Sequence, residues 1–215
     1  MMERVKLDQN KVKGRFIYHF FKRTLDIVAS ACALIILSPL FLVLAILIRH
    51  EDGGPAFYSQ ERIGKDGKPF KMYKFRSMIV NADQLVDQLE DQNEIDGAMF
   101  KIKDDPRITK IGHTIRKYSL DELPQLWNVL IGDMSLVGPR PPLPTEVEEY
   151  TDYDLQRLSV TPGCTGLWQV TKRNDADFDE MVELDIEYIN NSSLLYDLYL
   201  MFKTVGVVIH PNSAY

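Results

Sequence analysis

Two adjacent carboxylates, Asp121 and Glu122, and one arginine, Arg140, are the residues whose types and spacing could do chemistry. Asp121 can attack phosphorus as a nucleophile if cations offset the oxygen charge that develops, and Glu122 is a natural Mg²⁺ ligand. Pro139 and Pro141 fix the backbone on both sides of Arg140, which lowers the entropy that its guanidinium loses on binding an anion. Together these residues indicate carboxylate chemistry on a phosphorylated substrate.

A helix is expected to begin near Asp121. Ser119 followed by Glu122 fits a capping box, and Asp121 as the N-cap residue is the alternative. The spacing of the apolar residues predicts a helix with one apolar face, which consists of Leu123, Leu126, Trp127 and Leu130. Gly132 is expected to end this helix. Free N–H groups at a helix start would keep Asp121 ionised. In the simpler interpretation Asp121 only caps the helix and the arginine is a solvated loop residue, and such caps are much commoner than nucleophiles.

Three further cations are candidates for binding anions, and Arg116 could reach the same anion as Arg140. Lys74 and Arg76 end the second strand of a hairpin predicted from Tyr58–Ile63 and Phe70–Phe75, with Asp-Gly between the strands. They could bind phosphates or lipid headgroups, although a solvated strand face explains them equally well. Arg116 lies five residues before the carboxylates.

Composition and motifs exclude several classes of protein. The net charge of -6 argues against nucleic-acid binding. The sequence contains no Walker loop, no Cys and His metal-ligand pattern and no Gly-x-Ser-x-Gly elbow. Two cysteines, Cys32 and Cys164, form no disulfide framework and suit a reducing cytosol.

One stretch has the length and composition of a membrane helix. Ile27–Ile48 holds 22 residues without a charge, which is about 33 Å of helix. Ser38 and Pro39 lie at its middle, and the proline predicts a kink at which the serine hydroxyl re-satisfies a freed backbone group. The helix either spans the membrane with a bend or enters and leaves by the same face. Basic residues flank both ends, so charge asymmetry does not choose between these topologies.

The chain divides into three parts. Residues 1–23 form a basic arm with seven Lys and Arg against two acids. Residues 24–50 form the membrane helix, and residues 51–215 form a globular domain of mainly helical α+β class. Its last helix, Leu194–Val208, suits either an amphipathic position at the headgroup level or core packing.

Four motifs carry a resemblance to a known family. They are Lys74–Met78, Ser119–Leu126, Gly132–Pro141 and Pro162–Val170. In this order they resemble the bacterial sugar transferases, the monotopic polyprenyl-phosphate phosphoglycosyl transferases. The resemblance covers nearly the whole chain.

The resemblance implies transfer of a sugar-1-phosphate from a UDP-sugar to undecaprenyl phosphate, with release of UMP. Asp121 would be the nucleophile that forms an aspartyl phosphosugar, and Glu122 would help to hold Mg²⁺. Arg140 and Arg116 would bind substrate phosphates. Further candidates for substrate contacts are Pro139, Pro141, Lys74, Arg76, Gln169 and Arg173.

The resemblance also implies a re-entrant helix hairpin broken at Ser38-Pro39, with interfacial helices. The catalytic domain would face the cytoplasm at the bacterial inner membrane, in contact with its lipids. The sequence does not decide whether the protein forms a homo-oligomer.

The sequence departs from the family pattern in two places. Lys172-Arg173 stands where relatives often carry Gly-Arg, which weakens the assignment of Arg173. The long multi-span N-terminal region of many relatives is absent, which makes this a minimal catalytic form. No motif in the sequence identifies the transferred sugar. The resemblance is greater to the exopolysaccharide branch of the family, which favours UDP-glucose or UDP-galactose as the donor. Two alternatives remain: a membrane-anchored phosphohydrolase with an Asp nucleophile, and a non-catalytic assembly protein.

Overall fold

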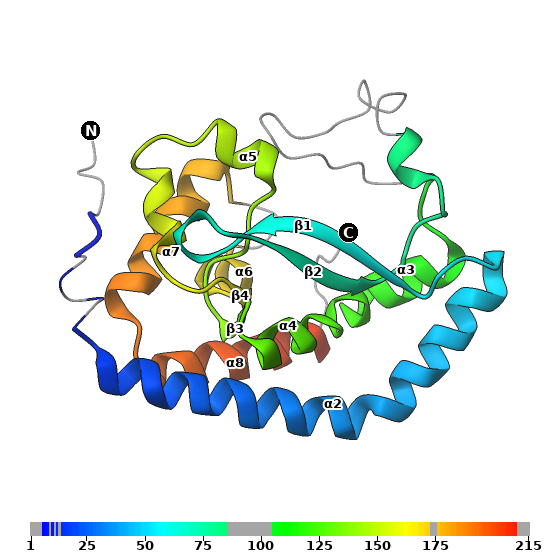
Figure 1. Cartoon of the computed structure of the whole chain (residues 1–215), viewed down its shortest axis with the longest axis horizontal. Coiled ribbons are helices and arrows are strands. Elements are labelled where there is room, and N and C mark those ends of the chain that lie inside the picture. The colour runs from blue at the N-terminus through cyan, green and yellow to red at the C-terminus, as the bar shows by residue number, and fades with distance from the viewer. Residues whose placement is uncertain are drawn as a thin grey trace.

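The computed structural model describes residues 6–8, 10, 12, 14–85, 105–172 and 176–209. In these residues the fold is mainly helical with two small sheets, which confirms the predicted α+β class. Figure 1 shows the long first helix running along one side of the other elements. The helices are α2 (Phe16–Asp52), α3 (Lys110–Lys117), α4 (Gln125–Ile131), α5 (Pro144–Glu148), α6 (Leu167–Thr171), α7 (Phe178–Asn191) and α8 (Leu194–Ile209).

Two strand pairs complete the fold. β1 (Phe57–Ile63) and β2 (Pro69–Phe75) form the predicted antiparallel hairpin. β3 (Ser135–Val137) and β4 (Gly163–Thr165) pair in parallel. The spacing of Leu85, Val86 and Leu89 predicts a helix over Asn81–Glu90. The described part of this range forms only a 3₁₀ turn, Ala82–Leu85, and residues 86–90 lie outside the described ranges.

Helix α2 is assigned as one helix that continues through Pro39, so the re-entrant hairpin with its break at Ser38-Pro39 stays a prediction. Figure 1 shows that this helix is bent, with its last part turning up toward α3. The Ser38 hydroxyl donates to the carbonyl of Ile35 at 2.8 Å. That carbonyl would otherwise pair with the N–H of residue 39, which proline lacks. The predicted repair by serine is therefore confirmed.

Cations near the start of α2 are used inside the protein. The Arg15 guanidinium donates to the Ser192 carbonyl at 2.8 Å, just past the end of α7. Lys22 pairs with the buried Asp197 of α8 at 2.9 Å. Arg23 donates to the carbonyls of Val129 and Leu130 at 2.6 and 2.9 Å. The last carbonyls of a helix carry partial negative charge, so these contacts lock α2 onto α4 and α7.

The other end of α2 is fastened to the same globular part. Glu51 accepts hydrogen bonds from the backbone N–H groups of Lys110 and Ile111, the first residues of α3. Asp52 forms a two-point ion pair with the Arg76 guanidinium. Ile48, one turn earlier, is buried in a core with Phe75 of β2.

The middle of α2 presents a bare apolar face. In its most apolar stretch of 18 residues only 11% is buried, and the helix is long and apolar enough to cross a membrane. The core helix of a soluble protein would be mostly buried, so this finding favours an anchoring role. The exposed side chains are Ile27, Val28, Ile35, Ile36, Leu42, Val43, Ile46 and Leu47.

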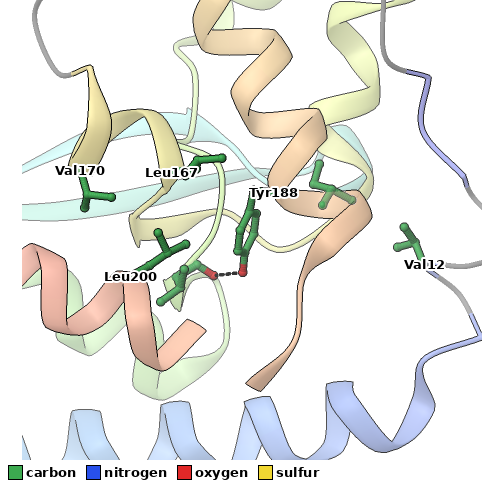
Figure 2. Close-up of a cluster of buried hydrophobic side chains, with 7 residues drawn as sticks. Val12, Leu167, Val170, Tyr188 and Leu200 are labelled. Atoms are coloured by element: carbon green, nitrogen blue, oxygen red, sulfur yellow. Dashed lines mark hydrogen bonds between the residues drawn. The ribbon is translucent and has the colours of Figure 1, made fainter. Parts of the chain in front are cut away.

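Helix α8 has one buried and one exposed apolar face. Leu200 is fully buried in the core cluster that Figure 2 shows, together with Val137, Leu167 and Tyr188. The Tyr188 hydroxyl donates to the Val137 carbonyl at 3.2 Å, the contact drawn as a dashed line in Figure 2. The other face of α8 exposes Leu195, Leu198, Tyr199, Phe202 and Val205. One face of the helix therefore belongs to the core, and the other is an uncovered apolar surface.

Candidate active site

A sharp turn presents the two carboxylates. After α3, Ser119 adopts a left-handed conformation with φ 53°, and Leu120–Glu122 form a single 3₁₀ turn. The Ser119 side chain makes no capping hydrogen bond, so the predicted capping box is wrong. Left-handed backbone at a residue other than glycine is strained, and such strain gathers at functional sites.

Helix α4 begins only at Gln125, after Pro124, and ends at Gly132 as predicted, with φ 101° at that glycine. The predicted apolar face is only partly covered: Leu123, Leu126 and Leu130 are half-buried and Trp127 is 49% exposed. The polar Gln125 and Asn128 are buried instead. Periodicity found an apolar stripe but could not tell whether that stripe meets a core or remains exposed.

The buried Asn128 fastens α4 to the hairpin. Its side-chain oxygen accepts from the Tyr73 N–H at 3.0 Å, and its amide nitrogen donates to the Lys71 carbonyl at 2.7 Å. Both partners lie on β2, so the contact fixes the strand relative to the turn before α4. Lys74 thereby reaches Glu122, with 2.8 Å between Nζ and the carboxylate.

Glu122 is held charged. Burial acts to raise its pKa, but Lys74, Arg140 and Arg62 outweigh that effect and lower the pKa to about 2. The side chain keeps 30% exposure, so it is accessible.

Asp121 differs from its neighbour. It is 8% exposed. Burial raises its pKa to about 6; the adjacent Glu122 adds to the rise, while Lys74 and Arg116 oppose it. The expectation that a helix start keeps Asp121 fully ionised is therefore corrected: the residue lies before the helix, and burial dominates. At neutral pH the carboxylate is still largely ionised.

Arg116 of α3 approaches Asp121 from the helix side. Its Nε donates to the Ser77 hydroxyl at 2.8 Å, which orients the guanidinium. Gly112 permits this packing, because a Cβ there would lie 2.0 Å from the Ser77 carbonyl oxygen. The structure thus brings together Asp121, Glu122, Lys74 and Arg116.

The loop that carries Arg140 is held through its backbone. The carbonyls of residues 139 to 142 each accept a hydrogen bond, from Gly163 N–H, Arg157, Arg62 and Ile63 N–H respectively. Prolines at 139, 141 and 142 donate none in return. Gly163 allows the close approach, because a Cβ on it would lie 2.0 Å from the Gly138 nitrogen. Arg140 itself is half-buried, with its charge felt at Glu122.

Sequence reasoning missed Arg62. It lies on β1 with 7% exposure, and its Nη1 donates to the Pro141 carbonyl at 3.2 Å. The signal was available, because Tyr58, Gln60 and Arg62 alternate along one strand face.

Other predicted residues fall elsewhere. Arg76 is buried, and its guanidinium is committed to Asp52 and to the carbonyls of Pro55 and Met78, so it ties α2 to the hairpin instead of facing the carboxylates. The sequence of residues 165–170 predicts a short strand or loop, but Gln169 lies on the helix α6, and its amide donates to the Cys164 carbonyl at 3.4 Å. Arg173 lies outside the described residues.

The carboxylates fit a Mg²⁺ ion that shares its coordination with a substrate. Among the described residues no three His, Cys, Asp or Glu side chains form a metal-ligand group. Mg²⁺ needs only one or two carboxylates when phosphates and waters complete its octahedron. The accessible, ionised Glu122 meets that requirement, with Asp121 beside it.

One cavity lies apart from this chemistry. It measures about 600 Å³ and is lined by the first half of α2, β3 and α7, including Tyr18, Lys22 and Ser192. None of its lining residues is Asp121 or Glu122. We therefore place the candidate site at the carboxylates, where the charged groups converge.

Comparison with known proteins gives a consistent result. Residues 17–211 match the family model described as bacterial sugar transferase. The chain is 51% identical over 90% of its length to the galactosyl transferase CpsE of Streptococcus agalactiae, and 48% identical over 100% of its length to the undecaprenyl-phosphate galactose phosphotransferase of Salmonella typhimurium. It spans only 43% and 45% of those two proteins. The exopolysaccharide production protein ExoY of Rhizobium meliloti is 42% identical, over 90% of this chain and 88% of its own length.

The charge of Lys74 controls the titration of Asp121. We expect Lys74→Met to raise the pKa of Asp121 above its value of about 6, because Lys74 is the strongest influence that lowers it. Infrared difference titration, with the Asp121 band assigned by Asp121→Asn, measures the shift. Lys65→Met, at the exposed hairpin turn, is the control. An unmoved or lowered Asp121 pKa in Lys74→Met would contradict the electrostatic assignment.

Proposed function

The chain belongs to the bacterial sugar transferase family, and from that premise we propose that it transfers a sugar-1-phosphate from a UDP-sugar to undecaprenyl phosphate with release of UMP. The names of two relatives contain galactose or galactosyl, so UDP-galactose is the first donor to test, with UDP-glucose second. The ExoY relative is named for exopolysaccharide production, and we place this reaction at the start of such an assembly.

One arrangement carries the proposal: the buried Asp121 lies next to Glu122, which Lys74 binds at 2.8 Å, and the charges of Arg116 and Arg140 act on this pair. A diphosphate substrate needs a nucleophile and positive charge to receive the developing oxygen charge. Asp121 supplies the first, and Lys74, Arg116 and Arg140 supply the second.

The mechanism we propose has two displacements. A carboxylate oxygen of Asp121 attacks the phosphorus next to the sugar, the bond to the bridging oxygen breaks, and UMP departs with that electron pair. The lipid phosphate then attacks the same phosphorus, and Asp121 leaves as a carboxylate. Each step exchanges one phosphorus–oxygen bond for another, so no further reactant is required.

Mg²⁺, when bound, would neutralise the phosphoryl oxygens. Glu122 and the substrate phosphates would hold it. Lys74 occupies one Glu122 oxygen and leaves the other available, which supports a shared site.

The way α2 is fastened supports a re-entrant topology. Arg23 and Lys22 attach its first half to α4 and α8, and Glu51 and Asp52 attach its last turn to α3 and β2. These partners form one globular part, which contacts both ends of the helix. A spanning helix would separate those ends by about 30 Å of hydrocarbon. We therefore propose that both ends lie on the cytoplasmic side of the cell membrane and that the exposed face of α2 enters the lipid.

The nucleophile assignment predicts that Asp121→Asn lowers UMP release by about a thousandfold or more, because an amide cannot attack phosphorus. The assay incubates the full chain in detergent with UDP-galactose or UDP-glucose and undecaprenyl phosphate. Asp152→Asn, an exposed aspartate, should retain activity.

The same experiment tests the intermediate. A donor with a labelled sugar should leave a covalent adduct on Asp121 when the lipid is omitted. Activity in Asp121→Asn would remove the nucleophile. Sustained release of free sugar phosphate without lipid would indicate the phosphohydrolase instead, and no turnover with any donor would indicate an assembly protein.

Metal dependence provides a separate prediction. Excess chelator should stop UMP release, and added Mg²⁺ should restore it, because two carboxylates and a diphosphate repel one another without a cation. Full activity in excess chelator would show that Glu122 does not serve a metal.

The topology prediction uses single cysteines at Gly14→Cys, before α2, and Lys65→Cys, after it, with Cys32 and Cys164 replaced by serine. We expect an impermeant thiol reagent to label neither position in intact cells and both in inverted membrane vesicles. Labelling of Gly14→Cys from outside intact cells would show a spanning helix.

A further inference from the structure

The charged groups of the site have an order. The strongest charge effects on Asp121 come from Lys74, Glu122 and Arg116, whereas those on Glu122 come from Lys74, Arg140 and Arg62. Contacts place part of this order: Lys74 binds Glu122 at 2.8 Å, and Arg62 donates to the Pro141 carbonyl, next to Arg140 in the chain, so these two arginines lie on the Glu122 side.

Arg62 and Arg140 form a like-charged pair with unused donors. A guanidinium has five N–H groups. Arg62 uses one on the Pro141 carbonyl and one on the Gln60 side chain at 2.8 Å, while its buried Nε has no partner among the described residues. The Arg140 guanidinium forms no hydrogen bond or ion pair with any residue that the structure describes. The pKa of Arg62 is lowered to about 10, by burial and then by the charge of Arg140.

Such a pair is unfavourable without an anion. A buried N–H without an acceptor and two neighbouring positive charges both raise the energy of the empty site. The charges of Glu146 and Glu122 offset part of this cost, but neither carboxylate accepts a hydrogen bond from the buried Nε of Arg62, which keeps no partner among the described residues. A phosphate supplies both the acceptor oxygens and the missing negative charge.

Building on the proposed function, we propose that Arg62 and Arg140 together bind one phosphate, first the phosphate that leaves with UMP and then the phosphate of the lipid acceptor. In-line displacement places the leaving oxygen opposite Asp121. When the lipid phosphate then displaces Asp121 from phosphorus, its attacking oxygen must also arrive opposite Asp121. The same position therefore serves both steps, and the arginines on the Glu122 side lie next to it.

Binding to the full chain in nanodiscs tests this without turnover. Arg62→Lys keeps a charge but loses the two-pronged geometry. We expect it to weaken UMP binding about tenfold or more, which corresponds to the loss of one charge-assisted hydrogen bond. Uridine binding should stay unchanged, because uridine has no phosphate. Lys68→Met, which removes an exposed cation of the same hairpin, should alter neither affinity.

Arg62 also supports the Pro141 loop, and the uridine comparison separates the two roles. Equal weakening of UMP and uridine binding, or unchanged UMP binding, overturns the assignment. If Arg62→Lys does not fold, Arg62→Gln replaces it, since glutamine can still donate to the Pro141 carbonyl but carries no charge.

The shared position has its own test. Arg62→Lys should raise the KM for undecaprenyl phosphate as well as the KM for the UDP-sugar. A change for the donor alone overturns the shared site. If the wild-type protein releases no UMP from any donor, the proposed function fails, and the UMP and uridine affinities still decide the role of Arg62.

Discussion

Two adjacent negative charges in a nearly dry site are the constraint on which the rest of the structure depends. Asp121 and Glu122 cannot both be ionised there without nearby cations. The surroundings divide the two residues: Lys74 and the arginines hold Glu122 charged, while burial leaves Asp121 with a pKa of about 6. Such separation of neighbouring carboxylates is how one site obtains a permanent ligand and a reactive group.

The long helix α2 contributes to that electrostatic arrangement at a distance. Arg23 binds the last carbonyls of α4, Asn128 of α4 binds the backbone of β2, and β2 carries Lys74 to Glu122. The contact that anchors the apolar helix is therefore the first link of a chain that ends at the carboxylates. A shift of α2 would move Lys74 relative to Glu122, so membrane attachment and the charge state of the site are physically connected.

Local signals in the sequence were sufficient for some elements and not for others. The Asp-Gly turn predicted the hairpin, Gly132 predicted the end of α4, and the Ser38 repair followed from proline chemistry. The role of Arg76 could not be predicted, because only tertiary packing brings Asp52 to it. Strand alternation could have singled out Arg62, but its contact with Pro141, 79 residues away, arises only from tertiary packing. The strained Ser119 has no local signature, because propensity favoured a capped helix.

The position of the carboxylates also fits an acceptor that cannot leave the membrane. The turn that holds Asp121 leads directly into α4, whose Trp127 and Ile131 are exposed, and α4 is bound to α2 through Arg23. Apolar side chains left bare on both helices favour burial in lipid. If α2 and α4 share that surface, the turn with Asp121, which leads into α4, lies close to the lipid headgroups. A lipid phosphate could then reach Asp121 while its chain stays in the hydrocarbon, and the UDP-sugar would approach from the opposite, aqueous side.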